Sequence, residues 1–233
     1  MKFISSRSSF SPYLKSLLTV LFLLLSVSAT GSVANPSTKA ATPWEVEALS
    51  PNVLRLALEA AQTATKQGIA NGRILGIIDF SLPSTKRRFW VLDTQAKRVL
   101  FYELVAHGKG SGENFATSFS NRPGSSQSSL GLYVTQSTYE GEHGYSLRLA
   151  GLEPGINDQA KPRAIVLHGA WYVSKNMIAQ YQRLGRSLGC PAVENSVVKP
   201  LIDTLKDGNL IFAYYPDKHW LSTSKFLNQA KQQ

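Results

Sequence analysis

The sequence predicts a mainly β fold of the α+β class, with short helices and one longer N-terminal helix beside the strands. Short runs rich in β-branched and aromatic residues recur along most of the chain. Gly, Pro, Asn and Ser separate these runs, a pattern typical of strands and turns. Only residues 51–67 form a long segment with the apolar periodicity of an amphipathic helix. The chain contains no internal repeat, so we expect a single β-rich domain.

Residues 51–67 have a start signal, an apolar face and a stop signal for a helix. Ser50 is a suitable N-cap, Pro51 fits the first helical position, and Gly68 fits the end. The apolar face consists of Val53, Leu54, Ala57, Leu58, Ala61 and Ala64. We expect this helix to pack on the outside of the domain and to carry no chemistry.

Strand signals dominate the chain after this helix. The predicted strands are residues 74–80, 88–93, 98–106, 130–136, 146–152, 164–168 and 210–215. The polar turn at 94–97 is short enough to join its flanking strands as a hairpin. Residues 175–184 and 197–206 are predicted helices. The Gly- and Ser-rich loop at 108–129 is a candidate rim or lid, because loops of this length are usually functional or disordered.

Residues 1–29 have the parts of a secretory signal peptide. Lys2, Arg7 and Lys15 make the start positive, residues 17–27 are apolar, and small residues follow at the cleavage position. The apolar run is shorter than the about 20 residues of a membrane span, although an uncleaved N-terminal anchor is an alternative. No cysteine lies near the cleavage position, which excludes a lipid-anchored lipoprotein. We therefore expect an exported protein.

The rest of the chain divides into three parts. Residues 30–72 are the linker and N-terminal helix, 73–216 the predicted catalytic domain, and 217–233 a C-terminal tail. Loss of the three basic residues of the signal peptide lowers the formal net charge from +10 to +7. A basic exported protein is attracted to anionic envelope surfaces and acidic substrates. No dense Lys/Arg run with interleaved aromatic residues is present, so nucleic acid is not an expected partner.

Cys190 and His168 are the candidate catalytic pair. Cys190 is the only cysteine and lies in the sequence SLGCP, whereas His168 ends the predicted strand 164–168. A thiol attacks as the thiolate, and a nearby imidazole can take its proton. The two residues are 22 positions apart, so the fold must bring them together. A buried structural cysteine and a structural histidine are the alternatives, but an unpaired cysteine in an exported protein indicates a reactive thiol.

Two motifs and their flanking segments resemble a known family. The His-Gly pair at 168–169 is followed by seventeen residues and the Ser-Leu-Gly-Cys motif at 187–190. Residues 88–108 are similar to the family's opening hairpin, and residues 129–133 to a Gly-containing strand entry. These features resemble the L,D-transpeptidase catalytic domain (YkuD-like fold), above all its bacterial murein L,D-transpeptidase subgroup. The resemblance covers roughly residues 74–216.

Two positions depart from the family pattern. Many relatives have Arg or Asn two residues after the cysteine, where this chain has Ala192. Many also have His two residues before the cysteine, where this chain has Leu188. If those side chains orient substrate or tune the thiol in relatives, this protein does so differently.

The resemblance implies a YkuD-like β-sandwich with Cys190 and His168 in a cleft. It also implies L,D-transpeptidation of peptidoglycan stem peptides in the periplasm or cell envelope of a bacterium. Cys190 would attack the carbonyl before a terminal D-alanine, while His168 takes the proton and later returns it. The backbone N–H groups of Gly189 and Cys190 are candidates for the oxyanion site, with Gly169 as a further backbone candidate. No cofactor and no metal are implied.

Three further residues are candidates, each with a structural alternative. Ser187 can support His168 or the acyl intermediate, or it can shape a turn. Arg186 can pair with a stem carboxylate, or it can be a solvated surface residue. Tyr133 can line the cleft or belong to the core.

The other histidines receive no chemistry. His143 is predicted to be an exposed turn residue, His107 a structural or surface residue, and His219 peripheral. The sequence does not identify the partner that orients His168, and a side chain and a backbone carbonyl are both candidates.

Competing functions remain at this stage. A metal site has weak support, because the chain has neither His-Glu-x-x-His nor paired cysteines. An L,D-carboxypeptidase or endopeptidase would use the same nucleophile with water as acceptor. A non-catalytic envelope-binding module is favoured by Ala192, whereas the presence of both Cys190 and His168 argues against it. We expect stem peptides as the partner, no obligate protein partner, and membrane contact only through an uncleaved signal peptide.

Overall fold

The structure is a computed structural model that describes residues 46–227 of the chain. The predicted signal peptide, the linker up to residue 45 and residues 228–233 of the tail lie outside the described residues. None of the described helices is long and apolar enough to pass through a membrane. The fold and the site below therefore concern residues 46–227 alone.

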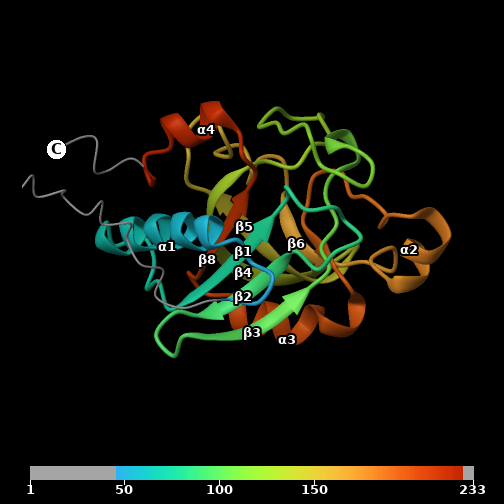
Figure 1. Cartoon of the computed structure of the whole chain (residues 1–233), viewed down its shortest axis with the longest axis horizontal. Helices are drawn as coiled ribbons and strands as arrows, with labels where there is room; N and C mark the ends of the chain where they lie inside the picture. Colours follow the sequence, from blue (N-terminus) through green and yellow to red (C-terminus); the bar gives the residue numbers. More distant parts are fainter. Residues whose placement is uncertain (1–45, 228–233) are drawn as a thin grey trace, which may run out of the picture. The chain divides into compact units, whose positions relative to one another are not determined.

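Eight strands in the described part of the chain join edge to edge in one sheet (Figure 1), in the order β3-β2-β1-β8-β4-β5-β6-β7. Neighbouring strands are antiparallel except for the parallel pairs β1–β8 and β6–β7. The strands are β1 Ile74–Asp79, β2 Phe89–Asp93, β3 Arg98–Glu103, β4 Gly131–Gly141, β5 Gly144–Gly151, β6 Val166–Gly169, β7 Ala192–Val193 and β8 Leu210–Tyr214.

This sheet confirms the predicted mainly β, α+β fold, and the expected sandwich takes the form of one continuous ladder. The predicted β2–β3 hairpin is present. β4 extends to Gly141, beyond the predicted end at 136, because its polar outer half continues the ladder with β5. The two-residue strand β7 was not predicted, since two residues are too few to show a periodicity.

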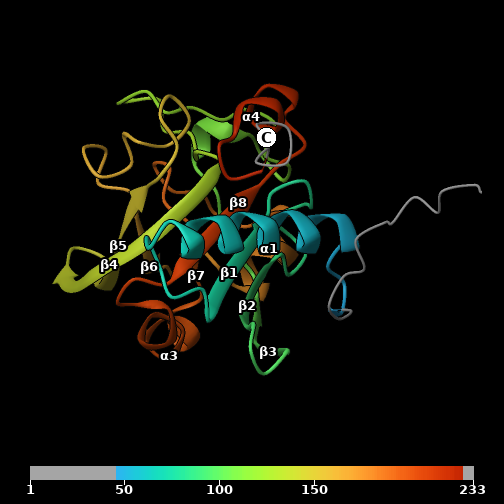
Figure 2. The ribbon, with the colours of Figure 1, turned by 90° about the vertical axis from the view of Figure 1, so that its left-hand side faces the viewer.

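α1 (Pro51–Lys66) confirms the helix predicted at 51–67 and packs against β1 and β8. Figure 2 shows it lying across the strands. Its apolar side is fully part of the hydrophobic core, with Leu54 and Ala57 buried. Just before the helix, the Glu47 carbonyl accepts a hydrogen bond from the Trp90 indole at 3.0 Å.

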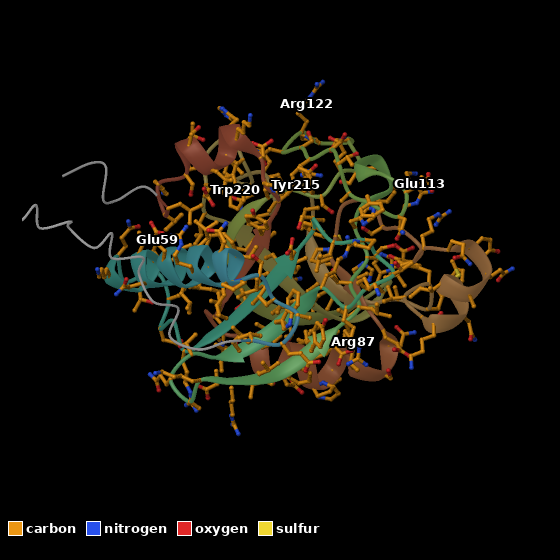
Figure 3. All side chains as sticks on the ribbon, viewed as in Figure 1. Glu59, Arg87, Glu113, Arg122, Tyr215 and Trp220 are labelled. Carbon is orange, nitrogen blue, oxygen red and sulfur yellow. The ribbon has the colours of Figure 1, made fainter. Side chains whose placement is uncertain are left out.

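The predicted C-terminal tail contains an unpredicted helix, α4 (Lys218–Thr223). The Asp217 carboxylate caps it by accepting a hydrogen bond from the Trp220 N–H at 2.7 Å. Trp220, labelled in Figure 3, is buried against Phe212 of β8, with ring centroids 5.5 Å apart. The start of the tail therefore belongs to the folded domain.

α3 (Asn195–Leu205) lies against β1, β5 and β6. Side chains alternate along a strand, so Gly76 faces away from Ile77. A Cβ on Gly76 would lie 3.5 Å from the Leu205 side chain, which places α3 over that face of β1. α2 (Lys175–Tyr181) is shorter than the predicted 175–184, because Gln182 adopts a left-handed conformation with φ 56° and ends it.

Candidate active site

The segment that carries Cys190 runs beside the chain that leaves β3. Short bridges pair Ala106 with Ala192 and Gly108 with Ser187. The Ser187 N–H donates to the His107 carbonyl at 3.0 Å, and the Lys109 N–H donates to the Ser187 carbonyl at 2.8 Å. The start of the long loop at 108–129 therefore fixes the backbone of the SLGC motif.

Ser187 shapes the turn that presents the cysteine. Its hydroxyl accepts from the Gly189 N–H at 3.1 Å and donates to the Cys190 carbonyl at 2.6 Å. Gly189 has φ 131°, and a Cβ there would lie 2.8 Å from the Gln127 carbonyl oxygen. Only glycine meets both conditions. These contacts support the turn-forming interpretation of Ser187, whose hydroxyl contacts backbone on both sides.

The half-buried Cys190 thiol lies between two backbone groups at the start of β6. The Val166 N–H donates to Sγ at 3.4 Å, and Sγ–H points to the Ala164 carbonyl at 3.7 Å. Burial raises the pKa of the Cys190 thiol, and the Val166 N–H and the Arg163 charge oppose that rise. Ala164 has φ 52°, a strained conformation for a residue with a Cβ, and such strain often occurs at functional sites.

The ladder between β6 and β7 brings His168 next to the cysteine. His168 pairs in register with Ala192, two residues after Cys190. The His168 backbone N–H donates to the carbonyl of Pro191, the direct neighbour of Cys190, at 3.4 Å. Within residues 46–227, no hydrogen bond joins the thiol to the imidazole. The ladder thus places His168 opposite the residue two positions after Cys190, and the thiol and the imidazole are not hydrogen-bonded to each other.

The His168 imidazole is oriented by its own strand. The side chain is only 2 % exposed, and Nδ1 lies 2.8 Å from the Gly169 carbonyl oxygen. A carbonyl can only accept, so Nδ1 carries the proton and Nε2 is left as the basic nitrogen. The orienting partner that the sequence left open is therefore a backbone carbonyl. Burial lowers the pKa of His168, the Gly169 carbonyl opposes this effect, and the charge of His143 adds to it.

Comparison with known proteins gives this geometry a family. Residues 45–214 match the L,D-transpeptidase catalytic domain. The chain belongs to this L,D-transpeptidase family. The family match includes α1 as well as the strands and both motifs. No curated protein matches the chain.

Solved L,D-transpeptidase structures resemble the chain at low identity. An L,D-transpeptidase from Mycobacterium smegmatis is 14% identical over 61% of this chain and 59% of its own, with a TM-score of 0.37. L,D-transpeptidase 1 from Mycobacterium tuberculosis is 13% identical over 61% and 62%, with a TM-score of 0.35. The helical cell shape determining protein Pgp2 from Campylobacter jejuni, solved as a variant, is 14% identical over 69% and 57%, with a TM-score of 0.41. The chain thus spans about three-fifths of the length of these proteins.

His143 is a residue of this L,D-transpeptidase domain that the sequence did not connect with the site. It lies in the turn between β4 and β5, and its ring stacks on His168 with centroids 4.4 Å apart and planes 23° apart. The residue is solvent-exposed, as predicted, yet one face of its ring covers the catalytic candidate. Periodicity could not reveal this contact, because the length of the β4–β5 hairpin determines where its tip lies.

Arg186, Tyr133 and Gly169 are engaged in structural contacts. Arg186 pairs with Glu113, which also accepts from Arg183 at 2.9 Å, so its guanidinium is already engaged with a carboxylate of this chain. Figure 3 shows Glu113 at the α2 end of the molecule. Tyr133 is buried, and its hydroxyl donates to the Ser129 carbonyl at 2.9 Å. A Cβ on Gly169 would lie 2.6 Å from the Asn195 side chain, so Gly169 packs against α3.

His107 is a buried structural residue. Arg88 donates to its Nδ1 at 2.7 Å, and its Nε2 lies 3.2 Å from the Gly112 carbonyl oxygen. Burial and the neighbouring Arg88 charge lower the pKa of His107 to about 4. His219 lies on α4 and is exposed. Among the described residues, no three His, Cys, Asp or Glu side chains are grouped to hold a metal ion.

Proposed function

We propose that the protein is an exported cysteine acyltransferase that performs L,D-transpeptidation on peptidoglycan stem peptides. One observation carries this proposal. The His168 imidazole, with Nδ1 held by the Gly169 carbonyl and Nε2 left basic, lies in the ladder position next to the Cys190 segment. The family match over residues 45–214 supports the reaction class.

The geometry favours a neutral resting pair. Burial raises the pKa of the Cys190 thiol and lowers the pKa of the His168 imidazole, so neither group is charged near pH 7. The thiolate then forms as the substrate arrives. His168 Nε2 takes the thiol proton while Sγ bonds to the carbonyl carbon of the L-centre residue, whose oxygen becomes the oxyanion.

The N–H of Cys190 is our candidate for the oxyanion donor. The N–H of Gly189, the other predicted donor, is bound to the Ser187 hydroxyl. The Cys190 N–H lowers the pKa of its own thiol. Within residues 46–227 it donates a hydrogen bond to no other residue. A preorganised N–H at this position stabilises the charge that develops on the substrate oxygen.

The second half of the reaction decides between transfer and hydrolysis. Collapse of the tetrahedral intermediate breaks the peptide bond, and His168 gives its proton to the departing D-alanine amine. The thioester on Cys190 is then attacked by an amine of another stem, which makes a cross-link, or by water, which trims the stem. We propose the amine as acceptor, in the periplasm or cell envelope to which residues 1–29 would direct the chain.

Disaccharide-tetrapeptide muropeptides provide the test. The mature protein and a Cys190→Ala variant are incubated with them, and the products are read by mass spectrometry. We expect loss of D-alanine and the appearance of dimers with the mature protein alone. Loss of D-alanine without dimers would instead identify a carboxypeptidase. No product in either sample would contradict both the transpeptidase and the carboxypeptidase activity and would favour a binding module.

A further inference from the structure

Arg163, which precedes β6, is bound to one loop by both terminal nitrogens of its guanidinium group. Nη1 donates to the Ser120 carbonyl at 2.7 Å and to the Ser129 hydroxyl at 2.6 Å. Nη2 donates to the Gln127 carbonyl at 2.6 Å and to the Ser125 hydroxyl at 3.3 Å. These four acceptors span residues 120–129, the second half of the long loop. Arg163 therefore fixes the conformation of this segment.

The charge of Arg163 is not neutralised by any carboxylate in the described part of the chain. Arg183 and Arg186 differ, because they share Glu113. All four acceptors of Arg163 are neutral oxygens. A partly buried cation without a counter-ion is stabilised by a group that becomes negative beside it.

Two groups that can ionise act on Arg163, namely Tyr133 and Cys190. Burial raises the pKa of Tyr133 far above neutrality, so its hydroxyl stays protonated. Burial, followed by the charge of the Cys190 thiolate, raises the pKa of Tyr172 to about 12, so its hydroxyl also stays protonated. The Cys190 thiolate is thus the anion that forms next to Arg163 during the proposed reaction.

The backbone connects Arg163 directly with the nucleophile. A Cβ on Gly189 would lie 3.2 Å from Arg163 Nη2, so the guanidinium is next to the residue before Cys190. The carbonyl of Ala164, the residue after Arg163, faces the thiol. Ser128, in the loop that Arg163 holds, donates its hydroxyl to the Gly189 carbonyl at 3.0 Å. Residues 120–129, Arg163 and residues 187–190, which we call the nucleophile turn, form one contiguous network.

We propose that Arg163 is a positioning residue that makes the reactivity of Cys190 depend on the order of residues 120–129. Its four hydrogen bonds hold the loop against the nucleophile turn, and its unpaired charge stabilises the thiolate. The thiol proton passes from Sγ to His168 Nε2, and no other bond changes. The inference rests on the proposed function only in taking Cys190 as the nucleophile.

Alkylation of the full chain by iodoacetamide as a function of pH tests the electrostatic part. Cys190 is the only cysteine, so the alkylation rate reports its thiolate alone. Arg163→Gln removes the charge, whereas Arg163→Lys keeps the charge without the planar fork. Arg122→Gln is the matched control, because it removes the same charge from the loop that Arg163 holds. Arg122 is exposed and points away from the molecule in Figure 3.

We expect the midpoint of the alkylation profile to rise by about 1 pH unit in Arg163→Gln. At pH 7 the rate then falls about tenfold. Arg163→Lys should shift the midpoint less, but proteinase K should cleave residues 120–129 faster in that variant. Arg122→Gln should keep the wild-type midpoint. Equal midpoints in folded Arg163→Gln and Arg122→Gln would overturn the inference.

If Arg163→Gln does not fold in a thermal-unfolding check, Arg163→Lys decides. Faster cleavage of the loop together with a small rise of the midpoint supports the inference. Faster cleavage with the wild-type midpoint, or wild-type cleavage, contradicts it. The muropeptide assay separates this inference from the proposed function. A midpoint shift in a protein that processes no muropeptide would contradict the proposed function and support the role of Arg163. Muropeptide processing without a midpoint shift would support the proposed function and contradict the role of Arg163.

Discussion

At the residue scale, the His143–His168 stack determines how the imidazole behaves as a base. The ring centroids lie 4.4 Å apart, so a charged His143 would face the imidazolium that forms in the proposed reaction when His168 takes the thiol proton. Burial acts in the same direction and is the larger effect on the His168 pKa. His168 is thus a weak base at rest, which keeps the thiol neutral until a substrate arrives.

Replacing His143 should separate the effects of its charge and of its ring. In His143→Ala, the pKa of His168 should rise by roughly 0.5–1 pH unit, because water reaches the ring and the neighbouring charge is lost. His143→Phe keeps a stacking ring without the charge, so the rise should be smaller. NMR titration of the imidazole C–H signals measures both pKa values. An unchanged value in His143→Ala would show that the stack does not tune His168.

At the element scale, the backbone at Gly108, where the long loop begins, packs directly against the backbone of Ser126 and Gly189. A Cβ on Gly108 would lie 2.4 Å from the Ser126 carbonyl oxygen and 2.8 Å from the Gly189 Cα. Gly108 itself has φ −67°, which any residue can adopt. Its glycine is therefore needed for close approach of the two segments and not for a backbone conformation.

Gly108→Ala should push the long loop away from the nucleophile turn. We expect a loss of about 1–3 kcal/mol in the free energy of unfolding, as for other overpacked sites, and a marked loss of muropeptide turnover. Gly124→Ala is the control, because Gly124 has φ 74° and a Cβ added there would meet nothing within 4 Å. It should cost about 1 kcal/mol through backbone strain and leave turnover intact. Urea unfolding and the turnover assay measure both, and equal turnover losses would contradict the steric explanation.

The sequence predicts those elements that carry a long enough local pattern. α1 shows its proline and its apolar face in sixteen consecutive residues, while the side chain of Ser50 before it makes no capping hydrogen bond. The strands show β-branched runs. β7 and α4 lack such a pattern, since β7 has two residues and α4 is held by the capping of Asp217 and the burial of Trp220. The Cys190–His168 pair is predicted from chemistry and motif alone. The contacts of His143 and Arg163 depend on hairpin length and loop conformation, which are set by tertiary packing.

At the scale of the whole molecule, the sheet order brings distant segments to the site. β6 carries His168 and receives β7 after the Cys190 turn, while β5 pairs with β6 and begins at the hairpin that delivers His143. The chain after β3 closes the other side of the turn through Ala106 and Gly108. His107, in this same segment, and Arg88, which donates to its ring, are fully buried. The stability of the site is therefore linked to the buried His107 ring staying uncharged and hydrogen-bonded to Arg88.

His107 makes the stability of the whole domain depend on pH. Its pKa is lowered to about 4 in the fold by burial and Arg88, whereas the unfolded value is near 6.5. Between these values the unfolded chain binds the additional proton, so stability is fully present above about pH 6.5 and is lost as the pH falls towards 4. The contribution is about 3 kcal/mol.

In His107→Gln, the amide can replace the ring without titrating, so the loss of stability between pH 7 and pH 4 should shrink by about that amount. Urea unfolding across this range measures the slope, with His219→Gln, an exposed histidine, as the control that should keep the wild-type slope. Identical slopes in wild type and His107→Gln would mean that the pKa of His107 is the same in the folded and the unfolded protein.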